Sequence, residues 1–376
     1  MAGIYIHIPF CKKACTYCNF HFRTSLQRRQ EMVAALQKEI ELRAPELAER
    51  PLQTIYFGGG TPSILSTEKI KRLLDAVFAS YNADAVSEIT LEANPDDLSE
   101  AFLKDLRHTP VNRFSIGVQS FREEDLRFMN RAHSAAEAEA AIKRAQDSGF
   151  ENLTVDLIYG TPGLTDADWK ANLNRIREYG VPHLSAYALT VEEGTALDHF
   201  IRKGKARPVD AAQSAGQALI LQEWTAHNGY EAYEISNFAR PGHRAVHNSS
   251  YWSGAPYLGI GPSAHSYDGR RTRRWNVASN SLYLQGMSVD GQPPHESEIL
   301  TDRDLHNEYV MTALRRMEGI DLEAVAARWG GEASAALRTI AEKHRAAGQL
   351  VLEGNRVALT PAGRLFADGI AAEMFR

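Results

Sequence analysis

Cysteine is scarce in this chain of 376 residues, and long apolar runs are missing. Only three cysteines occur, so the disulfide frameworks that hold small secreted domains together are excluded. No apolar stretch approaches the roughly 18 residues that a membrane-spanning helix needs. The first ten residues have neither the basic segment nor the cleavage site of a secretory signal. We therefore expect a cytoplasmic protein in which thiols stay reduced.

An excess of basic charge is also missing. The formal net charge is −5 and the sequence pI is about 6.2, which gives no general attraction to nucleic acid or to an anionic membrane. The length exceeds that of a typical single domain, and the hydrophobic fraction of 44% suits a globular protein with a sizeable core. We expect one large domain with a smaller appendage and no nucleic-acid partner.

The three cysteines are concentrated in one short segment, at Cys11, Cys15 and Cys18, directly after the first predicted strand. Thiolates are soft ligands for iron–sulfur clusters, zinc or copper(I). Three of them can hold three corners of a [4Fe–4S] cluster and leave the fourth iron open to a ligand, whereas electron-transfer clusters usually take four thiolates. Two alternatives remain: structural zinc, with His7 or His21 as a fourth ligand, and one disulfide with a spare thiol, which is disfavoured because three cysteines cannot all pair.

The first two-thirds of the chain alternates short β-rich runs with amphipathic helical runs. This alternation predicts repeated βα units and a parallel sheet. The predicted strands span residues 3–8, 53–58, 88–93, 113–118, 152–158 and 183–189. The predicted helices span residues 25–49, 67–80, 99–106, 123–129, 135–147 and 167–179. Six such units form either an open doubly wound sheet or a partial barrel, and the periodicity does not separate the two.

Unusual residues recur where the predicted strands end. Cys11, Gly58, Glu92, Gln119 and Asp156 each lie at or just beyond the carboxyl end of a strand. In parallel α/β folds this edge binds ligands. Because a carboxylate inside an apolar strand is costly to bury without a partner, we expect Glu92 and Asp156 to belong to a site.

The pattern changes after residue 189. We expect a helix at 209–228, a strand at 230–237, and an irregular, polar and aromatic region at 238–300 that ends in a linker. Residues 301–376 predict helices followed by a short hairpin, a winged-helix-like α+β arrangement. Acidic residues slightly outnumber basic ones there, so we expect a packing domain or lid rather than a DNA-binding module. The predicted domains are therefore residues 1–237, 238–300 and 301–376.

Three further features are candidates for ligand contacts. Three successive glycines, at residues 58–60 of the segment 57–62, would let backbone N–H groups approach a polar ligand, or would simply form a tight turn. Arg131 can hold a carboxylate with its fork of donors, or form a surface ion pair. His247 lies beside aromatic residues, where it either ligates haem iron or serves as a hydrogen-bonded loop histidine. Four nearby arginines can meet haem propionates or form a solvated charged strand: Arg270, Arg271, Arg273 and Arg274.

Taken together, these motifs resemble a known family. The Cys-x3-Cys-x2-Cys loop after Tyr5-Ile-His-Ile-Pro-Phe10, with Gly-Gly-Gly-Thr-Pro, Glu92, Gly-Val-Gln119 and Asp-Leu-Ile-Tyr-Gly160, is similar to radical S-adenosylmethionine proteins. More narrowly, it resembles the oxygen-independent coproporphyrinogen III oxidase-like family over nearly the whole chain. The resemblance implies an α/β fold, a partial (β/α)6 TIM-type barrel with a C-terminal winged-helix-like α+β domain.

The resemblance also implies roles for single residues. Cys11, Cys15 and Cys18 would hold a [4Fe–4S] cluster whose free iron chelates S-adenosylmethionine. Tyr5, Gly59 and Glu92 match positions that contact this molecule. Positions around a second molecule of it in the true oxidases are matched by Tyr17, Gly60, Thr61, Gln119, Arg131, Asp156 and Ala188.

Two departures from the oxidases favour the family's haem-chaperone branch. The true oxidases carry a further cysteine where this chain has Phe20, and the His-Asn-x-x-Tyr element at 247–251 resembles the chaperones, in which His247 would be the haem-associated residue. This branch implies haem as ligand and haem-accepting proteins as partners, with peripheral contact to membrane haem proteins among them, in a monomer or a dimer. The alternative is an enzyme that oxidatively decarboxylates coproporphyrinogen III.

Overall fold

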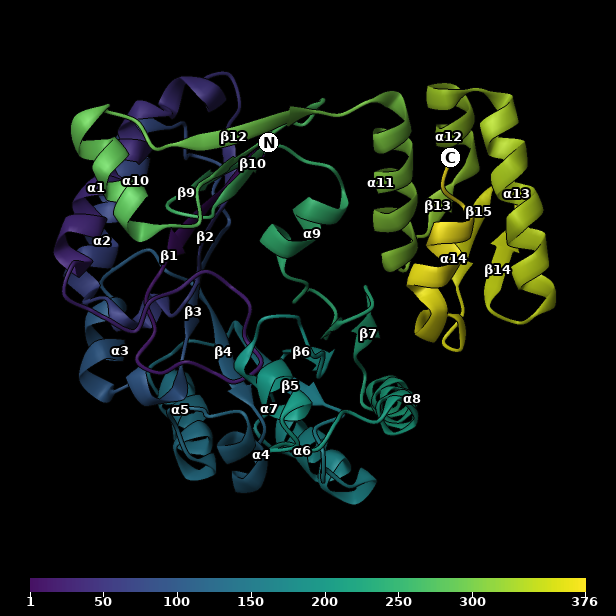
Figure 1. The fold of residues 1–376 in the computed structure, drawn as a ribbon, viewed down its shortest axis with the longest axis horizontal. Coiled ribbons are helices and arrows are strands. Elements are labelled where there is room, and N and C mark those ends of the chain that lie inside the picture. The colour runs from purple at the N-terminus through teal and green to yellow at the C-terminus, as the bar shows by residue number, and fades with distance from the viewer.

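A single large sheet organises the chain. The structure, a computed structural model, describes residues 1–376. Twelve strands form this sheet in the order β12-β11-β10-β9-β1-β2-β3-β4-β5-β6-β8-β7 (Figure 1). They span Ala2–Ile8 (β1), Leu52–Gly59 (β2), Glu88–Ala93 (β3), Arg113–Gln119 (β4), Leu153–Tyr159 (β5), His183–Ala188 (β6), Glu231–Ala232 (β7), Asn237–Ala239 (β8), Tyr257–Ile260 (β9), His265–Tyr267 (β10), Thr272–Asn276 (β11) and His295–Ile299 (β12).

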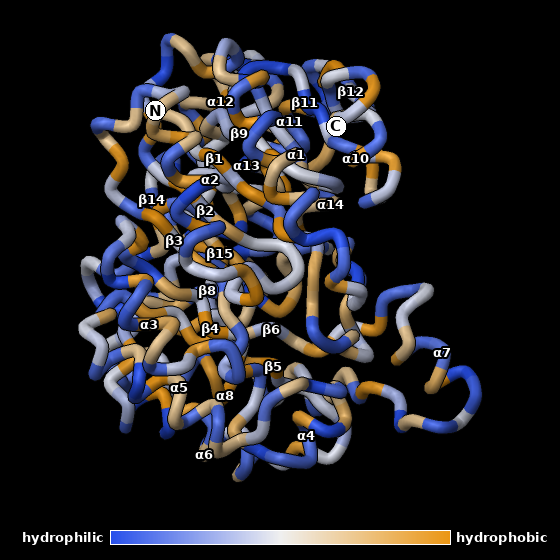
Figure 2. Tube along the Cα trace, turned by 90° about the vertical axis from the view of Figure 1, so that its left-hand side faces the viewer, coloured by the Kyte–Doolittle hydropathy of each residue, from blue (hydrophilic) through white to orange (hydrophobic).

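Parallel pairing from β1 to β6 makes the partial barrel that the resemblance implies, and helices cover its outer side. The helices span Arg29–Leu42 (α1), Thr67–Ser80 (α2), Glu100–Leu106 (α3), Glu123–Phe128 (α4), Ala135–Asp147 (α5), Asp166–Glu178 (α6), Ala196–Arg202 (α7), Ala211–His227 (α8), Val246–Trp252 (α9) and Asn280–Val289 (α10). Figure 2 shows α7 standing out from the body. None of the helices combines the length and apolar character that a membrane span requires.

The alternation of side chains along each strand gives the sheet two different faces. In β1, Ile4, Ile6 and Ile8 are fully buried in the main hydrophobic core, while Tyr5 and His7 point to the opposite face. Side chains two apart share a face of a strand. The outer face is therefore packed by aliphatic residues under the helices, and the concave inner face carries tyrosine, histidine, carboxylate and hydroxyl groups.

The six predicted parallel strands are present, and five of the six neighbouring helices begin and end within two residues of their predicted bounds. The long helix predicted over 25–49 is shorter, because only α1 and a 3-10 turn at Ala44–Leu47 form there. The strand predicted at 230–237 is wrong in detail. It is divided into β7 and β8, which pair antiparallel across a turn.

The region expected to be irregular, residues 238–300, contains regular structure. β9 pairs parallel with β1, and β10 to β12 extend the same sheet. Gly259 explains the error, because a Cβ at this position would lie 2.0 Å from the carbonyl oxygen of His265. Glycine here permits close approach of two strands and does not mark a loop.

The C-terminal part has its own core of buried apolar side chains. Its elements are α11 (Asp302–Arg315), β13 (Ile320–Asp321), α12 (Leu322–Trp329), α13 (Gly331–Ala346), β14 (Leu350–Glu353), β15 (Arg356–Leu359), the 3-10 turn η4 (Gly363–Phe366) and α14 (Ala367–Glu373). The order β13-β15-β14 with flanking helices is the predicted winged-helix-like arrangement.

Candidate functional site

A cavity of about 1050 Å³ opens at the carboxyl edge of β1 to β6. The cysteine loop and the strand ends form one wall, and residues of α11, α13, η4 and α14 form another. Twelve of the predicted site residues line it: Cys11, Cys15, Tyr17, Cys18, Gly59, Gly60, Thr61, Glu92, Gln119, Arg131, Asp156 and Ala188. Their convergence on one cavity is what the edge argument predicts. Two predicted residues, Tyr5 and His247, do not line it.

The three cysteines are free thiols, each partly exposed to the cavity. The Thr61 hydroxyl donates to the sulfur of Cys11 at 3.4 Å, and the Arg131 guanidinium donates to the sulfur of Cys15 at 3.2 Å. Burial raises the pKa of Cys11 to about 12, which favours the protonated thiol. Hydrogen-bond donors already directed at two sulfurs suit thiolates, which accept such bonds more strongly.

The zinc alternative finds no support in the geometry. No group of three or more His, Cys, Asp or Glu side chains is arranged to hold a single ion. Nε2 of His7 is bonded to the carbonyl oxygen of His21 at 2.9 Å, and Nε2 of His21 is bonded to Asn280 at 2.7 Å. Either histidine would have to give up its hydrogen bond to complete a Cys3His zinc site.

The glycines at 59 and 60 serve the cysteine loop. A Cβ on Gly60 would lie 2.6 Å from the carbonyl oxygen of Phe10, and one on Gly59, where φ is +105°, would lie 2.5 Å from the ring of His7. The N–H groups of Gly60 and Thr61 donate to carbonyls of the first strand and loop at 2.9 and 2.7 Å. These two N–H groups are therefore committed to fixing the loop, which agrees with the tight-turn alternative. Gly58 does not line the cavity.

Two carboxylates lie on the concave face beside the loop. Glu92 accepts a hydrogen bond from the Tyr56 hydroxyl at 2.8 Å, and burial raises its pKa to about 7. Asp156 accepts from the Ser115 hydroxyl at 3.3 and 3.2 Å, and burial raises its pKa to about 6. Each carboxylate accepts hydrogen bonds from only one side chain here. Each can therefore accept further hydrogen bonds from a ligand.

Arg131 is half-buried in the cavity wall and forms no ion pair, so the surface ion pair is not its role. Its Nη2 donates to Asn94 Oδ1 and to the carbonyl oxygen of Gly117, both at 2.6 Å, and its Nε has no partner. It links the cysteine loop to the ends of β3 and β4. Gln119, beside it, adopts φ of +68°, a conformation that non-glycine residues take mainly where surrounding structure imposes it.

The candidate haem ligand, His247, occupies a different environment from the expected one. It is fully buried on α9, with Nδ1 bonded to the Thr54 hydroxyl at 2.7 Å and Nε2 bonded to the Tyr251 hydroxyl at 2.8 Å. Its ring stacks on Tyr56 at 4.9 Å between centroids, and burial lowers its pKa to about 3. With both nitrogens bonded inside the barrel, it cannot ligate haem iron in this conformation. Its neighbour Asn248 lines the cavity instead.

Tyr5 lies behind the cavity wall, stacked on Tyr56 with its hydroxyl 3.3 Å from His7 Nδ1. The sequence analysis missed Tyr56 and Asn94, although alternation could have found both. Tyr56 is two residues before Gly58, and Asn94 is two after Glu92, so each shares the face of its neighbour. The C-terminal wall carried no such signal, because its contacts are long-range.

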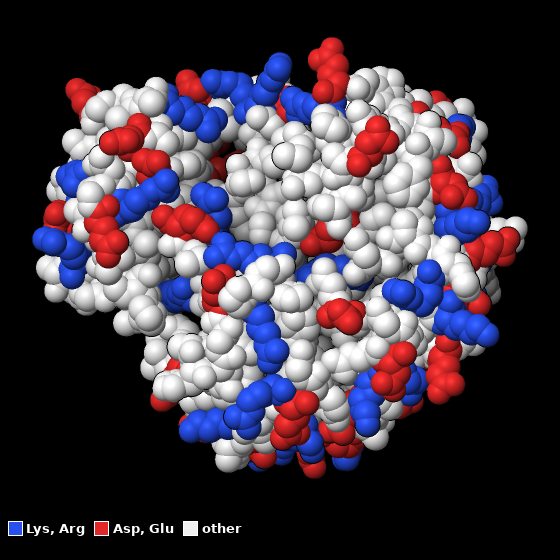
Figure 3. Space-filling view, turned by 180° about the vertical axis from the view of Figure 1, so that it is seen from behind, with Lys and Arg blue, Asp and Glu red and all other residues white.

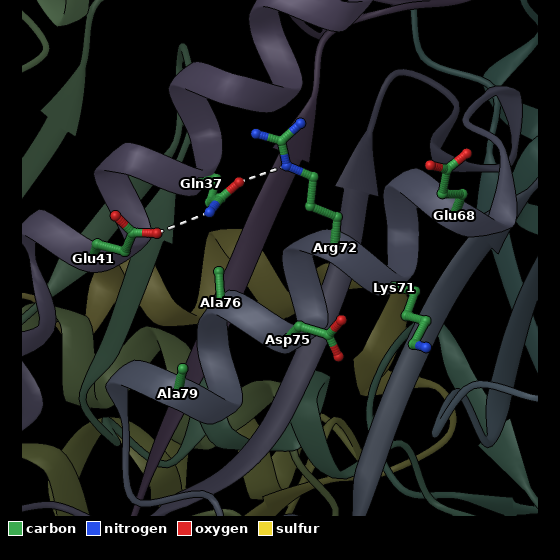
Figure 4. Close-up of a pocket in the computed structure, with 8 residues that line it drawn as sticks. All are labelled: Gln37, Glu41, Glu68, Lys71, Arg72, Asp75, Ala76 and Ala79. Carbon is green, nitrogen blue, oxygen red and sulfur yellow. Dashed lines mark hydrogen bonds between the residues drawn. The ribbon is translucent and has the colours of Figure 1, made fainter.

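The four arginines of the 270–274 segment do not reach the cavity. Arg271 pairs with Asp302, and Arg273 with Glu298 and Glu308 at 2.8 Å each, so this is the charged strand of the alternative interpretation. A second depression lies on the outer surface between α1 and α2 (Figure 4). Arg72 donates there to Gln37, which donates to Glu41, and we assign no site to this shallow surface.

Comparisons with known proteins agree with this geometry. The family model described as the radical SAM superfamily matches residues 5–176, and the HemN C-terminal domain matches residues 300–366. The heme chaperone HemW of Mycobacterium tuberculosis is 37% identical, over 98% of this chain and 93% of the relative. HemW of Bacillus subtilis is 33% identical over 98% of both chains, and HemW of Escherichia coli is 32% identical over 98% of this chain and 96% of the relative. The solved structure of coproporphyrinogen III oxidase HemN from Escherichia coli superposes with a TM-score of 0.85, at 25% identity, over 100% of this chain and 90% of that chain.

The partial barrel and its cysteine loop therefore define a radical S-adenosylmethionine protein. Within that class, the branch follows from relatives that are 32–37% identical over 98% of this chain. The chain belongs to the heme chaperone HemW family of coproporphyrinogen III oxidase-like proteins.

Proposed function

We propose that this protein binds haem and transfers it to haem-dependent proteins, and that it carries a [4Fe–4S] cluster on Cys11, Cys15 and Cys18 with S-adenosylmethionine beside it. One observation carries the proposal: three free thiols and two partly buried carboxylates converge on a single cavity whose far wall belongs to the C-terminal domain. The curated relatives that share nearly the whole chain are haem chaperones. A cytoplasmic protein, monomeric or dimeric, that contacts membrane haem proteins only peripherally fits this role.

The residues present fit the two cofactors. Thr61 and Arg131 already direct donors at the sulfurs of Cys11 and Cys15. Glu92 and Asp156 retain free acceptor capacity beside the loop, which suits ribose hydroxyls and the amino group of S-adenosylmethionine. When bound, the cluster would offer its open iron to the amino and carboxylate groups of that molecule. The protein's own task is to hold the thiols, place the carboxylates and limit the access of water.

The rival function is oxidative decarboxylation of coproporphyrinogen III. The position at which the resemblance places a further cysteine in the true oxidases is Phe20 here, and its side chain is exposed and lines the cavity. An aromatic ring supplies neither a thiol nor a proton donor. The departure from the oxidases thus lies at the site itself, which favours the chaperone.

Two assays on the anaerobically reconstituted full chain test the proposal. We expect haem bound by this protein to reach an added apo-haem protein and restore that protein's Soret absorption. We expect no protoporphyrinogen from coproporphyrinogen III with reductant and S-adenosylmethionine. Failure to bind or transfer haem, or steady turnover of the porphyrinogen, would overturn the chaperone function.

A further inference from the structure

Two arginines on the C-terminal wall of the cavity have hydrogen-bonding capacity that the protein does not use. Arg315 ends α11, and its guanidinium lies 5.0 Å over the ring of Trp252. It makes no hydrogen bond, and its closest carboxylates are Asp368 at 3.8 Å and Glu234 at 4.0 Å. Its Nε is buried without a partner. A guanidinium normally directs its donors at acceptors, so this side chain is held by stacking and left open toward the cavity.

Arg364, in η4, lies on the same wall. Its Nη2 donates to the carbonyl oxygen of Ala232 at 2.9 Å, and it forms no ion pair. Burial lowers its pKa, and Glu234 opposes that shift. Arg364 is partly buried, and a cation that is partly removed from water without a paired anion is destabilised, so an anionic ligand would lower that cost.

The nearby carboxylates do not hydrogen-bond to either arginine. Glu234 Oε1 accepts from the N–H of Ser236 at 2.9 Å and from the Asn237 side chain, while its Oε2 is buried without a hydrogen-bond partner, 4.0 Å from Arg315 Nε. Glu373 is bonded to Lys343 and His344, and Asp368 is 92% exposed. These acids therefore leave the donors of Arg315 and Arg364 available. The arginines of the 270–274 segment differ, because Arg271 and Arg273 are paired with acids on the surface.

We propose that Arg315 and Arg364 bind the propionate groups of haem, so that haem lies in the cavity against the C-terminal domain. The inference rests on the proposed function and deepens it. Two planar forks on one wall match two carboxylates on one edge of a porphyrin, since arginine binds carboxylates bidentately. The cavity volume of about 1050 Å³ and its mixed apolar and polar lining suit a large, flat, amphiphilic ligand.

This placement makes the C-terminal domain part of the haem site. Figure 3 shows the face of the molecule hollowed between that domain, on the left of the view, and the remainder, with basic side chains at the rim. Because one wall belongs to the sheet edge and the other to the C-terminal domain, a haem bound there contacts both. Release to a partner would then require the two arginines to give up the propionates.

The test is an anaerobic titration of the full, reconstituted chain with haem and with haem dimethyl ester, which has the same ring but no carboxylates. Wild type should bind haem more tightly than the ester. Arg315→Gln and Arg364→Gln should each weaken haem binding by about 10- to 100-fold, since hydrogen bonds to charged groups contribute about 1.5–3 kcal/mol and 1.4 kcal/mol is tenfold. Both variants should bind the ester like wild type.

Two controls separate binding from folding. Arg345→Gln changes an exposed arginine of α13 that pairs with Glu342 outside the cavity, and it should bind haem like wild type. Arg315→Lys keeps the positive charge but loses the fork of donors, and its haem affinity should fall between those of wild type and Arg315→Gln. Iron content and thermal melting of each variant report whether it is folded.

The outcomes are distinct. Equal binding of haem and its ester by wild type, or unchanged haem binding in both glutamine variants, would overturn the propionate site and leave the chaperone function standing. No haem binding by wild type would overturn the proposed function itself. Selective loss of haem binding with retained ester binding would support the site.

Discussion

The two ends of the concave barrel face use the same strands for opposite purposes. At the amino end, Glu88 accepts the N–H groups of Val246 and His247 at 2.8 and 2.9 Å and so caps α9. His183 connects the Thr154 hydroxyl to the Tyr233 hydroxyl. At the carboxyl end, by contrast, Glu92, Asp156 and the cysteine sulfurs have few protein partners.

This difference teaches that burial alone does not identify a site. His247 is fully buried and Glu92 is partly buried at the cavity wall, and desolvation disfavours the charged form of each. His247 stays neutral with both nitrogens bonded, so its burial is compensated by structure. Glu92 has its pKa raised to about 7 and keeps acceptor capacity, so its burial is compensated only when a ligand binds. The site differs from the core in having hydrogen-bond acceptors that no donor of the protein fully occupies.

We expect the largest effect at the carboxyl end, where the cysteine loop lies. Cys15→Ala removes one of three proposed cluster ligands, and we expect complete loss of the brown iron–sulfur absorption after anaerobic reconstitution, because two thiolates cannot hold the cluster. Ser25→Ala, an exposed position just beyond the same loop, should reconstitute fully. Retention of wild-type iron by Cys15→Ala would show that the loop does not hold a cluster.

At the amino end, substitutions should lower the stability of the fold. His247→Ala leaves the Thr54 and Tyr251 hydroxyls unpaired and opens a cavity beside Tyr56, and we expect a loss of about 3 kcal/mol in the free energy of unfolding. Chemical denaturation measures it. Asn248→Ala is the matched control, because Asn248 is the next residue along α9 and lines the cavity. This substitution should change the free energy of unfolding by less than about 0.5 kcal/mol. A stable His247→Ala variant that cannot bind haem would restore His247 as a haem ligand.

The carboxyl end of the barrel face could be predicted from the sequence and the amino end could not, for a physical reason. Glu92 and Asp156 stand in apolar strand runs, and the period of two assigns their face, so local pattern places them at the ligand edge. His247 depends on contacts far along the chain. It is covered because Gly3 has no side chain, where a Cβ would lie 3.1 Å from the His247 ring, and because Glu88 caps its helix. Neither contact leaves a periodic signal in the sequence.

A smaller effect should appear in the pH dependence of S-adenosylmethionine binding. Burial raises the pKa of Glu92 to about 7, and the ionised form accepts hydrogen bonds from ligand hydroxyls more strongly. Affinity should therefore rise about tenfold between pH 6 and pH 8 as Glu92 loses its proton. Calorimetric titration of wild type against Glu92→Gln subtracts any titration of the ligand. Parallel profiles for the two proteins would remove Glu92 from the binding site.

The smallest effect tests whether His247, at the amino end, is stabilised by its hydrogen bonds or by packing. Thr54→Val keeps the volume of the side chain but removes the hydroxyl that partners His247 Nδ1, and leaves that nitrogen buried without a partner. We expect a loss of about 1 kcal/mol in the free energy of unfolding, while Thr54→Ser, which keeps the hydroxyl, should lose less. Combined with His247→Ala, the Thr54→Val change should have no further cost, because the bond is already absent. If the two losses instead add, the ring is stabilised by stacking on Tyr56, and the comparison between the two ends would rest on packing and not on hydrogen bonds.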